Sequence, residues 1–201
     1  MAPLAMLAFL ASLGLFFVFS SVPASGVEAG VGSVIKSPAK FLYPLSQAQF
    51  NQYCLDAGYE QGVTALGSDA ESLRCVDEDG TKVVFDVDFV CASAYPQMEV
   101  PRSRLMTMGA TYSAWQCMDV VNYAGPPDFE AACKSIGKEL IFVGHPQGYL
   151  AYGWRCSPPV EFVPVTQNCK DLYGPNAIDR VDNVRSDEVE VAWGCYMLRA
   201  S

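Results

Sequence analysis

The chain has 201 residues, 22 of them acidic and 13 basic, which gives a formal net charge of −9. Phosphate backbones and anionic lipid surfaces repel so acidic a chain when it has no basic cluster, so nucleic acid is excluded as an expected partner. The eight cysteines are accompanied by one histidine and no Cys-x-x-Cys, which is not a zinc-site pattern. We therefore predict no metal and no cofactor.

The N-terminus predicts export. Leu4 to Phe19 is an apolar run, and no charged side chain occurs before Glu28. The run is shorter than the roughly 20 residues of a membrane-spanning helix, and small residues suited to signal peptidase follow it. We interpret residues 1–26 as a signal peptide, with an uncleaved anchor as the alternative. The protein is then secreted and extracellular, with no membrane association after cleavage, and residues 27–44 form an N-terminal lead segment.

The cysteines recur with nearly one period. Cys54 and Cys133 stand 79 positions apart, and the other three matched pairs stand 81, 78 and 78 apart. Flanking residues match too, as in the Ala-Trp-x-Cys sequences that end at Cys117 and Cys195. Such recurrence is typical of tandem repeats. We predict one four-cysteine module over residues 45–120 and a second over 127–199, with a short Gly- and Pro-containing break at 122–127 between them.

Each module predicts a small α+β unit with the order helix, β-hairpin, short helix and strand. In module 1 a helix begins after Ser46 and ends at Gly58, and module 2 repeats it from Asp128 to Gly137. A hairpin over 72–87 turns at Asp79-Gly80. We expect Asp88 to cap the short helix that carries Cys91, with Thr166 in that position of module 2. The closing strand carries the Trp two positions before a Cys.

An even number of cysteines in an exported chain predicts disulfides. Each module allows three pairings, which the sequence alone leaves open. We favour first with second and third with fourth, because that pairing fixes each helix to the strand that follows it. Each loop of some 20 residues would add about 3 kcal/mol to a marginal core of roughly 70 residues. The favoured pairs are Cys54–Cys75, Cys91–Cys117, Cys133–Cys156 and Cys169–Cys195.

The residues around the cysteines resemble a known pattern. Leu73-Arg-Cys75, Ser113-Ala-Trp-Gln-Cys117 and Gly153-Trp-Arg-Cys156 are similar to a four-cysteine extracellular repeat of secreted proteins, notably bacterial ones. That resemblance implies secretion and a fold but no activity. A more distant similarity to cyanovirin-N-type lectins rests on Phe50-x3-Cys54, Cys75-x4-Gly80 and Trp115. The third and fourth cysteines depart from it, so no sugar-binding residue is carried over.

Catalytic patterns are missing from the sequence. There is no Gly-x-Ser-x-Gly and no Gly-rich phosphate loop. His145 stands in a predicted surface turn and has no counterpart in module 1. Asp77, Glu78 and Asp79 could bind Ca²⁺ weakly, but the EF-hand spacing is absent and a solvated hairpin turn explains them better. We predict no catalytic residue, so the protein is expected not to be an enzyme.

Aromatic residues are the better indication of binding. Trp115 and Trp193 are expected to pack against disulfides. Tyr152 and Trp154 would share one face of a strand, where they serve the core or, if exposed, recognise a sugar or peptide. We expect a secreted, non-enzymatic binding protein with two equivalent modules, for carbohydrate or a cell-surface or cell-wall component. The alternatives are a secreted inhibitor or effector that binds another extracellular protein without a small-molecule pocket, and an unrecognised enzyme.

Overall fold

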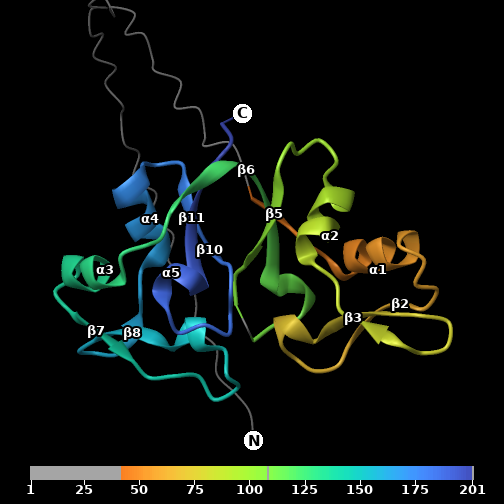
Figure 1. Ribbon diagram of the computed structural model, residues 1–201, viewed down its shortest axis with the longest axis horizontal. Helices are drawn as coiled ribbons and strands as arrows, with labels where there is room; N and C mark the ends of the chain where they lie inside the picture. The colour runs from red at the N-terminus through yellow and green to blue at the C-terminus, as the bar shows by residue number, and fades with distance from the viewer. Residues whose placement is uncertain (1–41, 108, 201) are drawn as a thin grey trace, which may run out of the picture. The chain divides into compact units, whose positions relative to one another are not determined.

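The computed structural model describes residues 42–107 and 109–200 (Figure 1). The predicted signal peptide and the lead segment up to residue 41 lie outside the described residues. Helices and strands both occur, so the α+β class is confirmed. Within the described stretches no helix is long and apolar enough to cross a membrane.

The first half of the described chain, residues 42–125, begins with a strand from the lead segment and a helix. Ser46 precedes this helix, and the Gln49 side chain accepts a hydrogen bond from the Ser46 N–H at 2.9 Å, as in a capping box. The elements in order are β1 (Leu42–Pro44), α1 (Gln47–Asp56), β2 (Gly62–Ala65), a 3₁₀ turn (Ala70–Ser72), β3 (Leu73–Val76), β4 (Lys82–Val83), α2 (Val87–Ala94), β5 (Pro101–Leu105), a 3₁₀ turn (Tyr112–Ala114) and β6 (Trp115–Gly125).

The second half, residues 126–200, has the same order after β1, except that a short helix replaces the second 3₁₀ turn. The Asp128 side chain accepts from the Ala131 N–H and so caps its first helix. The elements are α3 (Phe129–Ser135), β7 (Glu139–Phe142), a 3₁₀ turn (Leu150–Gly153), β8 (Trp154–Ser157), β9 (Glu161–Phe162), α4 (Val165–Tyr173), β10 (Ala177–Val181), α5 (Val189–Ala192) and β11 (Trp193–Leu198).

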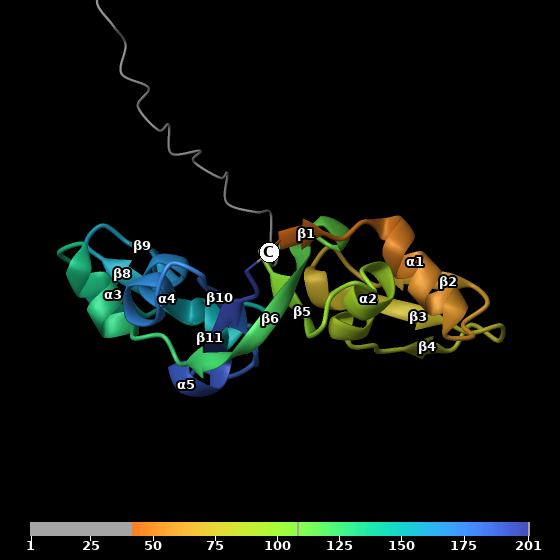
Figure 2. The ribbon, with the colours of Figure 1, turned by 90° about the horizontal axis from the view of Figure 1, so that it is seen from above.

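Each half contributes a three-stranded antiparallel sheet, β2-β3-β4 in the first and β7-β8-β9 in the second. A third sheet joins the halves through the long strand β6. The N-terminal part of β6 pairs with β1 and β5, and its C-terminal part pairs with β11, which in turn pairs with β10. Figure 2 shows β6 crossing from one half to the other. The halves are therefore linked by backbone hydrogen bonds as well as by the chain.

Four disulfides lie in the two cores, and the described residues contain no free cysteine. In each half one disulfide joins the first helix to the middle strand of the small sheet, and the other joins the second helix to the last strand. All eight cysteines are fully buried. The pairs are Cys54–Cys75, Cys91–Cys117, Cys133–Cys156 and Cys169–Cys195, the four that the sequence favoured.

Matched hydrogen bonds recur in the two halves. Tyr95 donates to the carbonyl oxygen of Pro44 at 2.8 Å, and Tyr173 donates to that of Pro126 at 2.8 Å. Gly125, just before Pro126, has φ +148°, and any side chain there would strike the Tyr173 hydroxyl. Two tryptophans and two arginines repeat their backbone contacts in the same way: Trp115 to Ala70, Trp193 to Ala151, Arg74 to Glu71 and Leu73, and Arg155 to Tyr152 and Trp154.

The structure adds strands that the sequence did not predict. β2 and β7 extend each hairpin to three strands, and β5 and β10 precede each closing strand. The predicted hairpin strand over 81–87 shortens to Lys82–Val83 because α2 begins at Val87. The predicted break at 122–127 is also wrong in part, since β6 continues to Gly125, where it pairs with β11.

The predicted cap of the short helix is wrong. The N-cap of α2 is Asp86, whose carboxylate accepts from the Asp88 N–H at 2.8 Å. In the second half Pro164 holds the N-cap position of α4, and Thr166 lies inside the helix. Asp88 and Thr166 each stand at the second helical position. Their side chains form hydrogen bonds outside their own helices, Asp88 with Ser103 of β5 and Thr166 with Asp179 of β10. These strands lie where the two halves meet, which we call the junction.

Candidate functional site

Two arginines cross the junction of the halves in opposite directions. Arg104 lies in β5 opposite Gln116, and Arg180 lies in β10 opposite Gly194, so the two occupy the same register position. Arg104 Nε donates to the carbonyl oxygen of Asp179 at 2.9 Å, and Arg180 Nε donates to that of Ser103 at 2.9 Å. The two contacts are reciprocal, because Ser103 and Asp179 also match in register.

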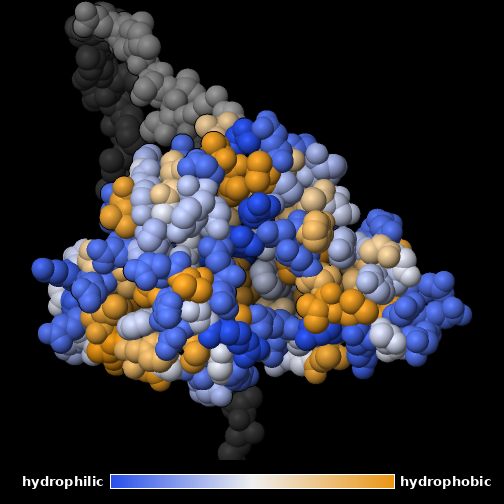
Figure 3. All heavy atoms as spheres, in the orientation of Figure 1, coloured by the Kyte–Doolittle hydropathy of each residue, from blue (hydrophilic) through white to orange (hydrophobic). Residues whose placement is uncertain are grey.

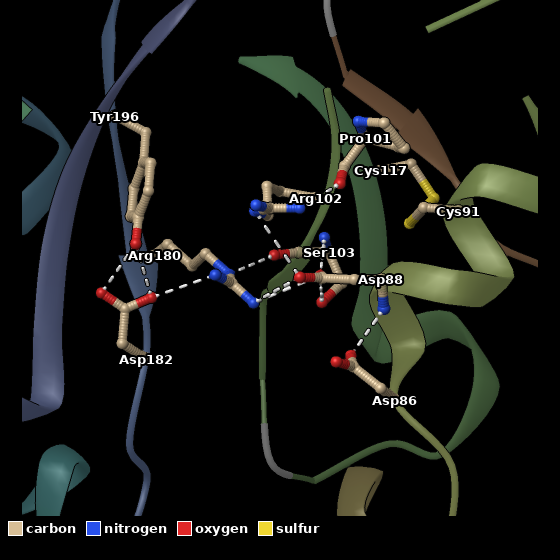
Figure 4. Close-up of polar contacts among 10 residues, drawn as sticks. All are labelled: Asp86, Asp88, Cys91, Pro101, Arg102, Ser103, Cys117, Arg180, Asp182 and Tyr196. Atoms are coloured by element: carbon tan, nitrogen blue, oxygen red, sulfur yellow. Dashed lines mark hydrogen bonds and ion pairs between the residues drawn. A yellow bond between two sulfur atoms is a disulfide. The ribbon is translucent and has the colours of Figure 1, made fainter. Parts of the chain in front are cut away.

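Each arginine also binds a carboxylate of the other half, but the carboxylates stand on different elements. Arg104 Nη2 contacts Asp179 of β10 at 2.7 Å, and the Thr166 hydroxyl of α4 donates to the same carboxylate. Arg180 Nη2 contacts Asp88 of α2 at 3.0 Å, and that carboxylate accepts from the Ser103 hydroxyl at 2.6 Å (Figure 4). In the first half the carboxylate is on helix α2 and the hydroxyl is on strand β5, whereas in the second half the hydroxyl is on helix α4 and the carboxylate is on strand β10. Each half therefore supplies one carboxylate and one hydroxyl.

Arg180 contacts two carboxylates, whereas Arg104 contacts one. Arg180 Nη1 contacts Asp182 at 3.2 Å, and Tyr196 donates to the same carboxylate at 2.9 Å (Figure 4). Burial raises the pKa of Asp182, and the neighbouring Arg180 guanidinium opposes that rise. The Arg104–Asp179 and Arg180–Asp88 ion pairs link the two halves, and the Arg180–Asp182 pair lies within the second half.

A cavity of about 460 Å³ lies beside this junction, in the second half. Its lining combines the rings of five Phe, Tyr and Trp residues with a few polar groups, and the start of the β5–β6 connection contributes one wall. Its volume is within the range of sites that bind small molecules. The lining residues are Met106, Thr107, Gly109, Phe129, His145, Ala151, Tyr152, Trp154, Arg155, Phe162, Val163, Val165, Thr166, Asp179 and Trp193.

The first half has a cleft of about 330 Å³ in the corresponding place, but its lining is different. Where the cavity has Tyr152, Trp154 and Phe162, the cleft has smaller or charged residues at the positions that match in cysteine spacing. The cleft also includes three carboxylates, whereas the cavity includes one. The matched cleft residues are Glu71, Leu73 and Val84, and the three carboxylates are those of Glu71, Asp86 and Asp182.

The two residues predicted for binding both line the cavity. Tyr152 lies in a 3₁₀ turn rather than in a strand, so the prediction that it shares a strand face with Trp154 is wrong. Its ring packs edge-on against Trp193, with the ring centroids 5.6 Å apart. Trp154 begins β8, packs against Phe142 with centroids 4.8 Å apart, and donates from Nε1 to the carbonyl oxygen of Asp187 at 3.0 Å. These contacts fix both rings in the cavity wall.

Phe162 and Arg155 belong to the same site, but the sequence analysis did not select them. Phe162 is 71% exposed, and the Arg155 guanidinium lies 4.2 Å from the centre of its ring. β9, which carries Phe162, has only two residues, so no alternating pattern marked it. The sequence feature that could have pointed to this site is the aromatic residue Phe162 a few positions after Trp154-Arg155-Cys156. Apolar atoms also gather over β7 and β8, at the lower left of Figure 3, where Phe142 and Val143 are exposed.

His145 lies in the loop after β7 and contributes to the cavity wall. Its ring packs near Tyr149, with centroids 5.3 Å apart. The one carboxylate of the cavity, Asp179, is already bound by Arg104 and Thr166. Within the described residues no three His, Cys, Asp or Glu side chains are placed to hold a metal ion, and those around Asp79 serve the hairpin turn.

Comparison with known proteins yields no relative. The chain matches no family model, no curated protein and no solved structure.

Proposed function

We propose that this is a secreted, non-enzymatic binding protein that recognises carbohydrate through the aromatic cavity of its second half. The observation that carries the proposal is the set of aromatic rings at that cavity, with Tyr152 and Trp154 fixed in its wall and Phe162 exposed beside Arg155. Flat aromatic faces with a few polar groups at their edges suit the alternating C–H and hydroxyl surfaces of a sugar ring.

The proposal includes the tandem architecture. Residues 45–120 and 127–199 are proposed as two copies of one four-cysteine module of the extracellular type. The equal order of elements, the matched disulfides and the reciprocal contacts of Arg104 and Arg180 support this duplication. The four disulfides support an oxidising, extracellular location after removal of a signal peptide. The different linings favour one principal site rather than two equal ones.

The first test is a glycan-array screen of the oxidised mature protein, residues 27–201, after mass spectrometry shows no free thiol. We expect reproducible binding that is lost on reduction. Phe162→Ala should weaken binding by about tenfold, since it removes one exposed ring. Because Phe162 is 71% exposed, its loss should change the free energy of unfolding by less than about 0.5 kcal/mol.

Val84→Ala is the matched control. Val84 occupies the corresponding position of the first half, is 68% exposed and lines the smaller cleft. It should leave glycan binding unchanged. A folded wild-type protein that binds no glycan would overturn the carbohydrate proposal. In that case the exposed apolar residues Phe142, Val143, Val160 and Phe162 favour the second candidate, an extracellular protein partner.

A further inference from the structure

We infer that the carbohydrate bound in this cavity is acidic, and that Arg155 binds its carboxylate. This inference rests on the proposed function and narrows its ligand class to sugars that carry a uronic acid. It comes from the unused hydrogen-bonding capacity of one guanidinium, from the charge balance of the cavity, and from the difference between the cavity and the smaller cleft.

Arg155 has one edge committed and one edge available. Its Nη1 donates to the carbonyl oxygens of Tyr152 and Trp154, the latter at 2.7 Å, and this fixes the side chain. Among the described residues, Nε and Nη2 have no hydrogen-bond acceptor, and no carboxylate forms an ion pair with this guanidinium. A guanidinium has five N–H donors in a fixed plane, so a fixed Arg155 keeps donors available for a ligand.

Among the described residues that line the cavity, Arg155 has no ion-pair partner, whereas Asp179 has one. The carboxylate of Asp179 lies within 2.7 Å of Arg104 and also accepts from Thr166, so it is neutralised away from the ligand. The Arg155 side chain is partly buried, and this burial lowers the pKa of its guanidinium. A desolvated cation gains more from a carboxylate partner than an exposed one does.

The smaller cleft lacks this preference. Arg74 occupies the position of Arg155 and donates from Nη1 to the carbonyl oxygens of Glu71 and Leu73 in the same way. The cleft around it also contains the carboxylates of Glu71, Asp86 and Asp182. Glu71 pairs with Arg185 and Asp182 pairs with Arg180, so Asp86 is the cleft carboxylate without an ion pair among the described residues. The two arginines share one structural contact but face different linings, since Leu73 and Val84 of the cleft replace Trp154 and Phe162 of the cavity.

The ligand is inferred to be a sugar acid because the cavity wall contains both a guanidinium, which suits a carboxylate, and aromatic rings, which suit a sugar ring. A carboxylate matches the planar donor edge of Arg155. The Trp154 ring and the face of Phe162 that Arg155 leaves uncovered would pack on the attached sugar ring. The chain has a net charge of −9. Long-range attraction therefore cannot gather anions here, and binding has to come from this local contact.

The experiment compares two forms of one ligand by calorimetric titration of the oxidised mature protein. The probes are short oligomers of galacturonic acid and of glucuronic acid, each as the free acid and as the methyl ester. Esterification keeps the sugar ring and removes the charge. We expect the free acid of at least one oligomer to bind about tenfold or more tightly than its ester, the effect of one charge-assisted hydrogen-bonded pair.

The variants separate recognition from structure. Arg155→Gln should reduce affinity for the free acid by about tenfold or more and leave affinity for the ester unchanged. Arg74→Gln removes the matching backbone hydrogen bonds in the first half, and it should leave both affinities unchanged. Near-ultraviolet circular dichroism and thiol assay establish that each variant is folded and oxidised.

The outcomes distinguish this inference from the proposed function. Equal binding of acid and ester, or unchanged affinity in Arg155→Gln, would overturn the acidic ligand while leaving a lectin. Binding of neutral glycans on the array without binding of either uronic acid oligomer would do the same. Binding of no glycan at all would overturn both.

Discussion

Replacing Arg104 by Met tests the junction of the two halves. The side chains of Arg104 and Asp179 are 9% and 8% exposed, and they contact each other at 2.7 Å. Removing the cation leaves the Asp179 carboxylate buried with the Thr166 hydroxyl as its remaining side-chain partner. Breaking a buried pair from one side costs about 3–5 kcal/mol, because the surviving charge has lost its compensation. We expect Arg104→Met to lower the free energy of unfolding by that amount.

Arg180→Met is the control, since it removes the reciprocal arginine. Arg180 and Asp88 are 19% and 16% exposed, and Asp88 keeps the Ser103 hydroxyl and N–H as donors and Arg102 at 3.7 Å. Asp182, the other carboxylate that Arg180 contacts, keeps the Tyr196 hydroxyl as a donor. Partial exposure and these remaining donors limit the loss to about 1.5–3 kcal/mol, the range for hydrogen bonds to charged groups. Urea unfolding of the oxidised proteins, followed by circular dichroism, measures both losses. A loss below about 1 kcal/mol for Arg104→Met, or a larger loss for Arg180→Met, would refute this reasoning.

Two further variants address single groups. Burial raises the pKa of Asp182 above its usual 3.8, so the folded state binds a proton that the unfolded state has lost, and stability falls as pH rises from about 3.8. The stability advantage of wild type over Asp182→Asn should therefore shrink as the pH rises above 3.8 in urea titrations, whereas a growing advantage would contradict the shift. The Tyr152 hydroxyl is buried without a hydrogen-bond partner among the described residues. Tyr152→Phe should leave the free energy of unfolding unchanged or raise it by up to about 1 kcal/mol, and a loss of that size in thermal or urea unfolding would show that the hydroxyl is satisfied.

Local chemistry explains which elements the sequence predicted. Ser46 and Asp128 stand before apolar positions at helical spacing, and both precede helices in the structure. The sequence left three disulfide pairings per module open, and the favoured one rests on a single local argument, that each pair fixes a helix to the strand that follows it. Such signals lie within about 26 residues of one another, which is the longest separation that a disulfide closes here.

The missed elements depend on contacts between distant residues. β5 reads Pro-Arg-Ser-Arg-Leu, which is too polar to predict a buried strand. Arg104 is buried because Asp179, 75 positions later, neutralises it. The same difficulty hid the cap of α2, because Asp86 and Asp88 are both capable of capping and only the position of Arg180 assigns Asp88 to the junction. No local pattern contains that information.

The candidate site was predicted in part for a related reason. Tyr152 and Trp154 were selected as aromatics close in sequence, and both line the cavity. Phe162 and Arg155 were missed because their value comes from being placed together, with the guanidinium 4.2 Å from the ring centre. An arginine next to a cysteine in a strand has no distinguishing pattern until its partners are known.

The two halves combine a shared junction with different linings, and this bears on the proposed binding function. The reciprocal arginine contacts need one carboxylate and one hydroxyl per half, and both halves supply them even though helix and strand have exchanged the two groups. The cavities have no such constraint, and Tyr152, Trp154 and Phe162 stand where the first half has Glu71, Leu73 and Val84. Two equal sites would gain affinity on a multivalent surface through avidity. A single principal site gains nothing from that effect. The first half then contributes mainly the buried Arg104 contact and the wall residues Met106, Thr107 and Gly109, which complete the cavity of the second.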